Sequence, residues 1–112
     1  MTDGTLREPT FLILTALADR ARHGYGILLD IEKISDGRVK LRAGTLYAAL
    51  DRLSTAGWVA VDREEVVDGR LRRYYRLTDA GAARLAAEVS RVRAHTRAAE
   101  SRLRVRLAGG AA

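Results

Sequence analysis

The sequence contains no cysteine, a single proline and a single tryptophan, and it has no long uninterrupted apolar run. Without cysteine the chain can form neither disulfides nor thiolate metal sites, so it does not need an oxidising compartment. No segment approaches the roughly 18 apolar residues of a membrane span, and the first residues lack the charged-then-apolar order of a signal peptide. We therefore expect a cytoplasmic protein without membrane association.

The residue patterns that catalysis and cofactor binding need are also missing. The sequence shows no nucleophile paired with a base, no phosphate-binding glycine loop and no spacing of metal ligands. The adjacent acids Glu64 and Glu65 fall on a segment expected to be an exposed strand, and His95 stands alone among arginines. We expect no enzyme activity, no metal and no cofactor.

The chain of 112 residues fits one domain, and 47% of its residues are hydrophobic, which is enough for a core. A chain this short buries a modest fraction of its surface and often gains stability by pairing with a second copy. We therefore expect an oligomer.

Basic side chains outnumber acidic ones by 20 to 14, for a net charge of +6, which favours a polyanionic partner. All the basic residues except Lys33 and Lys40 are arginines, a bias that a genome rich in G and C explains equally well. Placement therefore matters more than the total. One short segment concentrates four arginines: Arg70, Arg72, Arg73 and Arg76.

Two helices are expected in the first 37 residues. Residues 9–20 start with proline, which suits the first helical position, and are apolar nearly all round, so they predict a buried helix. Residues 23–26, HGYG, break the pattern, and we expect His23 and Tyr25 to serve packing and capping rather than ligand binding. A second helix, ending near residues 35–37, is predicted by apolar residues at helical spacing: Ile27, Leu28, Ile31 and Ile34.

A third helix and a hairpin follow. Leu46, Leu50 and Leu53 mark the helix, Gly57 lies where a left-handed cap is wanted, and Trp58 is placed to pack onto the last turn. Alternating valines then lead to a turn at residues 67–70, and the returning strand ends at residue 77. The fold class is therefore mainly α with a small β-hairpin, in the helix, helix, helix, hairpin order of a winged helix-turn-helix.

A fourth helix is predicted over residues 79–107, capped by Thr78 and Asp79 and roughly 43 Å long. Apolar or small residues recur along it at steps of three and four, which indicates a seam against another helix: Ala82, Leu85, Val89, Val92, Thr96, Ala99 and Leu103. A second copy of the chain is the expected partner, and folding back on the same domain is the alternative. The predicted organisation is a winged helix-turn-helix domain over residues 1–78, a dimerisation helix over 79–107 and a disordered tail over 108–112.

These segments together resemble the PadR family of bacterial transcriptional regulators over nearly the whole chain. The resemblance rests on four blocks in this order: residues 9–17, residues 23–27 (HGYGI), residues 44–57 beginning GTLY, and residues 72–78 (RRYYRLT) followed by Gly81. It implies a homodimer of the short subgroup, built through one long helix after the wing. It also implies repression at a palindromic operator and release by a small molecule.

Two positions depart from the family pattern. In some short members a tryptophan on the dimer helix stacks on flat aromatic drugs, but the corresponding residue is Val89 and the chain's tryptophan is Trp58. Drug sensing is therefore not expected from the resemblance alone. Arg42 and Ala43 stand where the family often has Ser-Pro, which makes Arg42 a candidate phosphate contact.

The third helix supplies one set of candidate DNA contacts. Burial of its leucines turns Thr45, Tyr47 and Arg52 outward, so the first turn offers hydroxyl groups to DNA. Packing against the hairpin is the alternative for Tyr47, and helix capping is the alternative for Thr45.

The hairpin supplies the second set: Arg70, Arg72 and Arg73, near the turn, are candidates for phosphate or minor-groove contacts. Their alternative is a solvated hairpin tip in which acids of the facing strand, Asp62, Glu64 and Glu65, neutralise the arginines across the ladder.

The sequence thus predicts a homodimeric, ligand-responsive repressor that binds a pseudo-palindromic site on double-stranded DNA. Its expected dimer interface comprises Leu85, Val89, Val92, Thr96, Ala99 and Leu103. The alternative is a winged-helix homodimer that acts as a protein adaptor without binding DNA.

Overall fold

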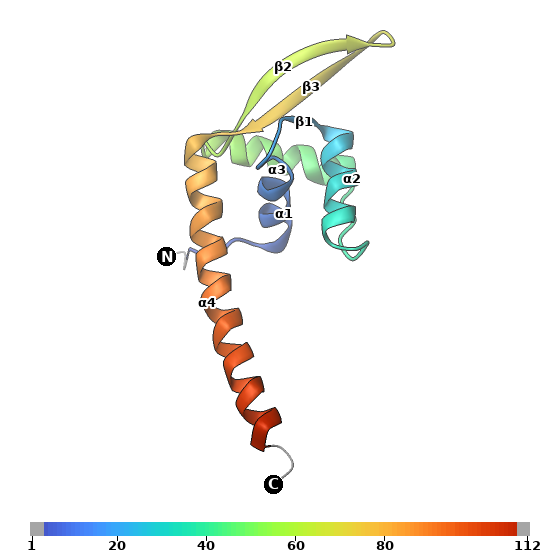
Figure 1. Ribbon diagram of the computed structural model, residues 1–112. Helices are drawn as coiled ribbons and strands as arrows, with labels where there is room; N and C mark the ends of the chain where they lie inside the picture. The colour runs from blue at the N-terminus through green and yellow to red at the C-terminus, as the bar shows by residue number, and fades with distance from the viewer. Residues whose placement is uncertain (1–3, 110–112) are drawn as a thin grey trace.

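The computed structural model describes residues 4–109, which form four helices and a three-stranded antiparallel sheet (Figure 1). In chain order the elements are α1 (Glu8–Ala16), β1 (Arg22–His23), α2 (Gly24–Ile34), α3 (Ala43–Thr55), β2 (Val59–Val67), β3 (Arg70–Leu77) and α4 (Asp79–Gly109). The sheet order is β1-β3-β2, so the hairpin of β2 and β3 forms the wing and β1 pairs with its inner strand. The fold is a winged helix-turn-helix with a long C-terminal helix, as the sequence predicts.

The core lies between α1, α2 and α3, where apolar faces of the three helices meet. The hairpin covers one end of this bundle and α4 runs along its side (Figure 1). The largest fully buried side chains come from the three helices and from the start of β2: Ile13, Leu14, Ile27, Ile31, Leu46, Leu50 and Val59.

Helix α1 ends at Ala16, four residues before the end that the apolar pattern predicts. The guanidinium Nε of Arg22 donates a hydrogen bond of 2.7 Å to the Ala16 carbonyl, and the Leu17 N–H bonds to Leu14. Both contacts use carbonyl groups that a continuing helix would need. The expectation of a helix to Arg20 is therefore wrong, because a distant side chain caps α1 early.

Helix α2 starts at Gly24, so the HGYG segment that was expected to break the helical pattern lies mostly inside the helix. Residues 22 and 23 are held extended because they pair with β3, with His23 opposite Tyr74. His23 is the N-cap residue, but its side chain makes no capping hydrogen bond, and Tyr25 is 64% exposed. His23 packs on Tyr74, whereas neither His23 nor Tyr25 performs the expected capping.

Two positive-φ turns confirm the predicted ends of α3 and β2. Gly57 has φ +82°, its N–H bonds to Ser54 and the Trp58 N–H bonds to Leu53, which is a Schellman cap. Asp68 and Gly69 have φ +50° and +74°, as a two-residue hairpin turn of the right twist requires.

The wing contains a β-bulge that the sequence did not reveal. Val61 pairs with Tyr75, but Arg63 pairs with the next residue, Tyr74, so Asp62 has no partner across the ladder. A bulge bends the strand and moves the following side chains to the opposite face. Arg63 therefore lies on the same face as Tyr74.

Helix α4 starts at a closely packed joint. The Thr78 hydroxyl accepts a hydrogen bond from the Gly81 N–H at 3.0 Å and donates one to the Gly57 carbonyl at 2.6 Å. A Cβ atom at Gly81 would lie 2.1 Å from the Trp58 carbonyl oxygen, so only glycine permits this approach. The predicted cap at Thr78 is confirmed.

Beyond this joint, α4 packs on α1 and then projects away from the rest of the chain (Figure 1). The molecule measures 68 Å along its long axis and 30 and 24 Å across. The helix includes Ala108 and Gly109, which were expected in a disordered tail, and residues 110–112 of that tail lie outside the described residues. No helix within residues 4–109 combines the length and apolar character needed to cross a bilayer.

Candidate nucleic-acid interface

A cleft of about 700 Å³ separates the wing from the adjoining ends of α2 and α3. It is lined by His23, Gly24, Tyr25, Tyr47, Val67, Asp68, Arg70, Leu71, Arg72 and Arg73. Four predicted contact residues thus meet here, Tyr47 from α3 and the three arginines from the wing. Arg42, Thr45 and Arg52 do not line the cleft, although all three are exposed on α3 or at its start.

Helix α3 exposes the side chains that its apolar spacing predicts to be exposed. Its buried residues are Leu46, Ala49, Leu50 and Leu53, which leaves Thr45, Tyr47 and Arg52 on the surface. Arg42 is the N-cap residue and makes no side-chain capping bond. Within residues 4–109 no side-chain hydrogen bond or ion pair engages Arg42, Thr45 or Arg52.

Tyr47 lies across the start of α2. A Cβ atom at Gly24 would be 2.2 Å from the Tyr47 hydroxyl oxygen, so the absence of a side chain at Gly24 makes room for the phenol. The Tyr47 side chain nevertheless stays 47% exposed and borders the cleft. Packing and ligand contact are thus compatible at this residue, and the observed packing is against α2 at Gly24.

The wing arginines differ in their partners. Arg73 donates to Glu64 across the ladder at 2.8 Å, so the expected cross-strand neutralisation applies to this residue. Glu65 and Asp62 instead bind Arg63 on their own strand, at 2.9 and 3.0 Å.

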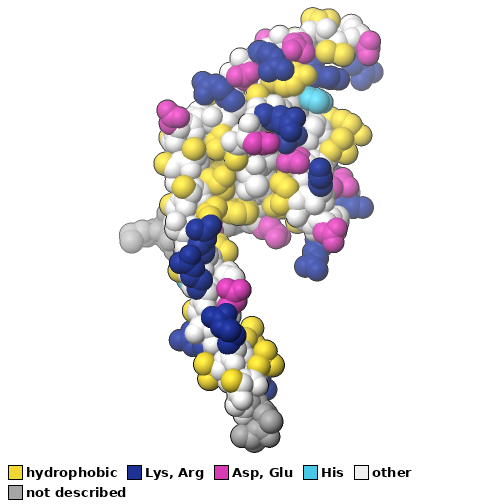
Figure 2. Space-filling model, in the orientation of Figure 1, with side chains coloured by type: hydrophobic (Ala, Val, Ile, Leu, Met, Phe, Trp, Pro, Cys, Tyr) yellow, Lys and Arg dark blue, Asp and Glu magenta, His cyan; other side chains and the backbone are white. Residues whose placement is uncertain are grey.

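Among residues 4–109, neither Arg70 nor Arg72 forms an ion pair or a hydrogen bond. Figure 2 shows basic side chains along the wing with acidic ones between them. Arg70 and Arg72 are therefore the wing cations that are free to bind an anion in the cleft.

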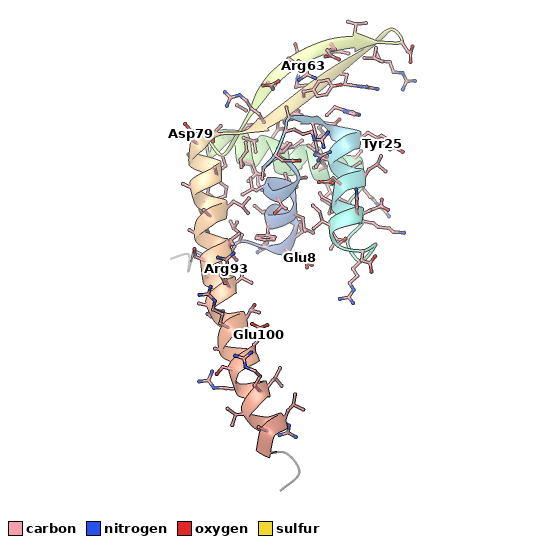
Figure 3. All side chains as sticks on the ribbon, viewed as in Figure 1. Glu8, Tyr25, Arg63, Asp79, Arg93 and Glu100 are labelled. Carbon is pink, nitrogen blue, oxygen red and sulfur yellow. The ribbon has the colours of Figure 1, made fainter. Side chains whose placement is uncertain are left out.

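Three side chains stack where the wing meets the helices. The Arg63 guanidinium lies 3.9 Å from the centre of the Tyr74 ring, and His23 meets the same ring edge-on at 5.3 Å. Figure 3 places Arg63 on the wing above the start of α2. The bulge at Asp62 creates this stack, because it brings Arg63 to the face that carries Tyr74.

His23 is a cleft residue that sequence reasoning assigned to packing and capping. Its pKa is lowered by burial and further by the positive charge of Arg72, while Glu65 acts in the opposite direction. The sequence around His23 does not indicate that it lines a cleft. The opposite wall of the cleft is formed by residues about fifty positions later in the chain.

A second surface lies on α4, where the predicted interface residues are found. Val89, Val92 and Leu103 are 37%, 42% and 56% exposed, and Thr96 and Ala99 are also exposed. With α1 this surface forms a groove of about 380 Å³, lined by Phe11, Val89, Val92, Arg93, Thr96, Arg97 and Glu100.

Leu85, by contrast, is only 9% exposed and belongs to the chain's own core. Leu85 thus agrees with the alternative of a seam folded on its own domain, whereas Ala82 in the first turn of α4 is exposed. From Val89 onward the seam residues are exposed.

A buried carboxylate ties α4 to the start of the chain. Glu88 is 3% exposed and accepts two hydrogen bonds from the Arg91 guanidinium, at Oε1 and Oε2. These bonds lower the pKa of Glu88, and the Leu6 backbone N–H lowers it further. Arg84 adds a hydrogen bond to the Gly4 carbonyl and lies over the Trp58 ring. The periodic pattern of α4 did not reveal this polar cluster, because a glutamate normally marks an exposed position.

The geometry of the cleft offers groups that can recognise an anion. Within residues 4–109 no three His, Cys, Asp or Glu side chains are grouped so as to hold a metal ion. What the chain presents is an exposed helix face, unpaired guanidinium groups beside it, and a separate apolar stripe on a projecting helix.

Comparison with known proteins agrees with this arrangement. Solved structures of similar fold include a PadR family transcription regulator from Clostridium difficile R20291, with a TM-score of 0.67 and 24% identity over 84% of this chain and 96% of that one. Another is Bacillus subtilis PadR, whose crystal structure is in complex with operator DNA, with a TM-score of 0.66 and 21% identity over 74% of this chain and 48% of that one.

Sequence similarity is higher to the transcriptional regulator Rv3488 of Mycobacterium tuberculosis, at 41% identity over 73 residues. The match covers 65% of this chain and 64% of Rv3488. The profile of the transcriptional regulator PadR-like family matches residues 13–87, from within α1 to the first turns of α4. The matched residues include the whole winged helix-turn-helix unit except its first turn, and the chain therefore belongs to the PadR-like family of transcriptional regulators.

Proposed function

We propose that the chain is a sequence-specific, DNA-binding transcriptional repressor that acts as a homodimer and responds to a small molecule. The observation that carries the proposal is the cleft, where Tyr47 of α3 and two unpaired arginines of the wing, Arg70 and Arg72, face the same space. A regulator of this kind acts on chromosomal DNA, in the cytoplasm.

DNA recognition follows from the shapes and charges of the two elements. A helix fits the major groove, where Thr45 and Tyr47 meet base edges or the adjoining phosphates. Arg42, Arg70 and Arg72 supply cations for the backbone on either side of this helix. Arg73 contributes less, because Glu64 already neutralises its charge.

Dimerisation follows from the apolar stripe on α4. The chain itself covers the stripe only as far as Leu85, and from Val89 to Leu103 it stays in solvent. A second copy buries the same residues by two-fold symmetry, which is the commonest arrangement in homo-oligomers. The two α3 helices then reach successive major grooves, about 34 Å apart, on a pseudo-palindromic site.

Regulation requires a ligand that binds the two arrangements of the dimer with different affinity. The groove between α1 and α4 adjoins the proposed interface, and its volume of about 380 Å³ suits a small molecule. Val89 lines this groove in place of the tryptophan of some short members, and Phe11 of α1 contributes an aromatic ring to the lining. A bound molecule changes the separation of the two heads, which are the winged helix-turn-helix domains of the dimer, and so lowers operator affinity.

The test starts with selection of duplexes from random-sequence DNA by the full-length protein. Arg72→Ala and Arg73→Ala are then compared for their affinity to a selected duplex over a range of salt. Arg72→Ala should weaken binding by about tenfold and reduce the salt slope by about one, as loss of a phosphate contact does. Arg73→Ala should have the smaller effect, since that residue is paired.

A protein adaptor is the second candidate, favoured by the carboxylates that neutralise Arg63 and Arg73 on the wing. The adaptor hypothesis predicts that the protein selects no duplex. It also predicts that Arg72→Ala and Arg73→Ala change neither the affinity for DNA nor the affinity for heparin.

A further inference from the structure

His23 occupies an unusual place among the cleft residues. It sits at the junction of β1 and α2, and it lines the cleft together with Tyr47 and the unpaired wing arginines. Its ring is held on two sides, by the edge contact with Tyr74 and by the α2 backbone at Gly26, where a Cβ atom would lie 3.3 Å from the imidazole Cε1. The ring is thus positioned by packing on groups outside the cleft.

No hydrogen bond from within residues 4–109 reaches the imidazole nitrogens. No enclosed side-chain nitrogen or oxygen within residues 4–109 lacks a partner, so the imidazole nitrogens of His23 are accessible from solvent and able to bind an added group. The cleft is the open space that His23 borders, so a group that enters the cleft can supply the missing partner.

The charges around His23 determine its protonation. From β3, Arg72 opposes the cationic form of the imidazole, and Tyr74 contributes the ring contact. From β2, Glu65 favours the cation but is itself engaged by Arg63, which stacks on the Tyr74 ring.

The remaining neighbours change this balance little. Tyr25 on α2 and Tyr47 on α3 also line the cleft. Arg22 on β1 bonds to the Ala16 carbonyl and pairs with Asp19 and Asp30. Burial and Arg72 together lower the pKa of His23, so the imidazole of the free protein is mostly neutral at pH 7.

We propose that His23 is a further DNA-contacting residue, which takes up a proton and binds a backbone phosphate when the duplex occupies the cleft. This inference rests on the proposed function, because it concerns the same cleft.

The physical reason is a change in the sign of the local field. In the free protein the positive charge of the Arg72 guanidinium disfavours a second cation at His23. A phosphate between the two neutralises Arg72 and offers an acceptor to the imidazolium, so the histidine pKa is higher in the complex than in the free protein. Binding and proton uptake are then linked, and duplex affinity rises as pH falls between the two pKa values.

The experiment uses the full-length chain and a fluorescent duplex obtained by selection from random-sequence DNA. Affinity is measured from about pH 8 to about pH 5.5 at constant ionic strength, the range in which histidine titrates. Affinity should rise by up to about tenfold per pH unit for each head that gains a proton. Calorimetry in two buffers of different ionisation enthalpy should show proton uptake on binding. The salt slope should also be steeper at the acidic end, because one more cation meets the backbone.

Two variants separate charge from packing. His23→Gln should remove the proton uptake and flatten the pH dependence of affinity. His23→Arg carries a fixed charge and can still stack on Tyr74, so it should bind near pH 8 with the affinity that the unmodified protein reaches near pH 6. His95→Gln is the matched control, because His95 is the chain's other histidine and lies exposed on α4. That variant should keep both the pH dependence and the proton uptake.

The outcomes distinguish this inference from the proposed function. Duplex binding without proton uptake, or an unchanged pH dependence in a folded His23→Gln protein, overturns the role of His23 and leaves DNA binding in place. A chain that selects no duplex at any pH overturns both.

Discussion

The two ends of this molecule differ in what holds them in shape. At one end α3 and the wing owe their positions to the chain's own core, through the buried leucines of α3 and the contacts of Tyr47 and Tyr74. At the other end the last turns of α4 are exposed, with Val105 and Leu107 at 71% and 80%. The comparison teaches that the core of one chain fixes the candidate DNA-binding surface but leaves the far part of α4 uncovered.

The largest expected effect is a loss of stability when the closely packed joint at Gly81, between the two ends of the molecule, is disrupted. Gly81→Ala would place a Cβ atom 2.1 Å from a backbone oxygen and 2.7 Å from the Leu77 side chain, so the joint must open. We expect a loss of about 3 kcal/mol in the free energy of unfolding, measured by urea denaturation. Gly44→Ala is the control: no atom lies within 4 Å of its Cβ, and its change should stay within about 1 kcal/mol. Equal stability of the two variants would show that the joint is not closely packed.

A charge introduced on the apolar stripe of α4 should prevent dimerisation without unfolding the winged helix-turn-helix domain. Val92→Asp is expected to yield a monomer with a normally folded head, because Val92 is already 42% exposed. Loss of the second head should weaken duplex binding by about a hundredfold, the usual size of a bivalent effect. Analytical ultracentrifugation and fluorescence anisotropy measure the two results.

Val105→Asp provides the matched control for this variant. Val105 lies on the same helix, about 140° round the axis from Val92, and is more exposed. It should leave the dimer and the affinity unchanged, and a monomer from this variant as well would contradict the assignment of the stripe.

A smaller change at the recognition end tests whether Tyr47 needs its place over α2. Gly24→Ala brings a Cβ atom within 2.2 Å of the Tyr47 hydroxyl oxygen. The phenol can swing aside, so stability should change much less than in Gly81→Ala, but duplex affinity should fall by about tenfold, as for one lost hydrogen bond to a charged group. Tyr47→Phe should show a similar loss. Full affinity in both variants would assign Tyr47 to packing alone.

Acid should loosen the packed half of α4 through Glu88. Because its pKa is lower in the folded chain than in the unfolded chain, Glu88 contributes stability at neutral pH that is lost as pH falls below about 4. Glu88→Gln should therefore be less stable at pH 7 and should lose less stability on acidification than the unmodified chain does. Thermal denaturation at several pH values measures both slopes, and parallel slopes would exclude Glu88 as a source of acid sensitivity.

The smallest expected effect concerns the paired arginine of the wing. Glu64→Gln removes the partner of Arg73, which is an exposed pair of low energetic value. Duplex affinity should rise by about twofold, because a third wing cation becomes available, and stability should change by less than about 1 kcal/mol. A fall in affinity would mean that the pair orients Arg73 for binding.

Local patterns predicted most of the fold. The apolar spacing of α3, the left-handed Gly57, the Asp68-Gly69 turn and the Thr78 cap each depend on residues close in sequence, and all four are confirmed. The early end of α1 and the bulge in β2 were not predictable in this way. The first depends on a carbonyl captured by Arg22, and the second on how the two wing strands pair.

The candidate site shows the same division. The exposed phase of α3 follows from helical periodicity, and so does the exposure of Val92 and Leu103 on α4. His23 in the cleft and Glu88 in the interior depend on contacts between distant segments, which the residue types alone do not suggest. Which of the wing arginines is free depends on Arg63, because it engages two carboxylates that sequence reasoning offered to the opposite strand.

The single hydroxyl of Thr78 joins the end of α3, the end of the wing and the beginning of α4. The long helix α4 is therefore anchored at its first turn, close to the end of α3, and any rotation about this anchor is amplified along its length. A helix of 31 residues is about 46 Å long, so a turn of about 5° at this anchor moves its far end by about 4 Å. In the proposed dimer, a shift of that size where two α4 helices cross would rotate each α3 helix by only a few degrees, which would allow fine adjustment of the spacing between the two DNA-binding domains.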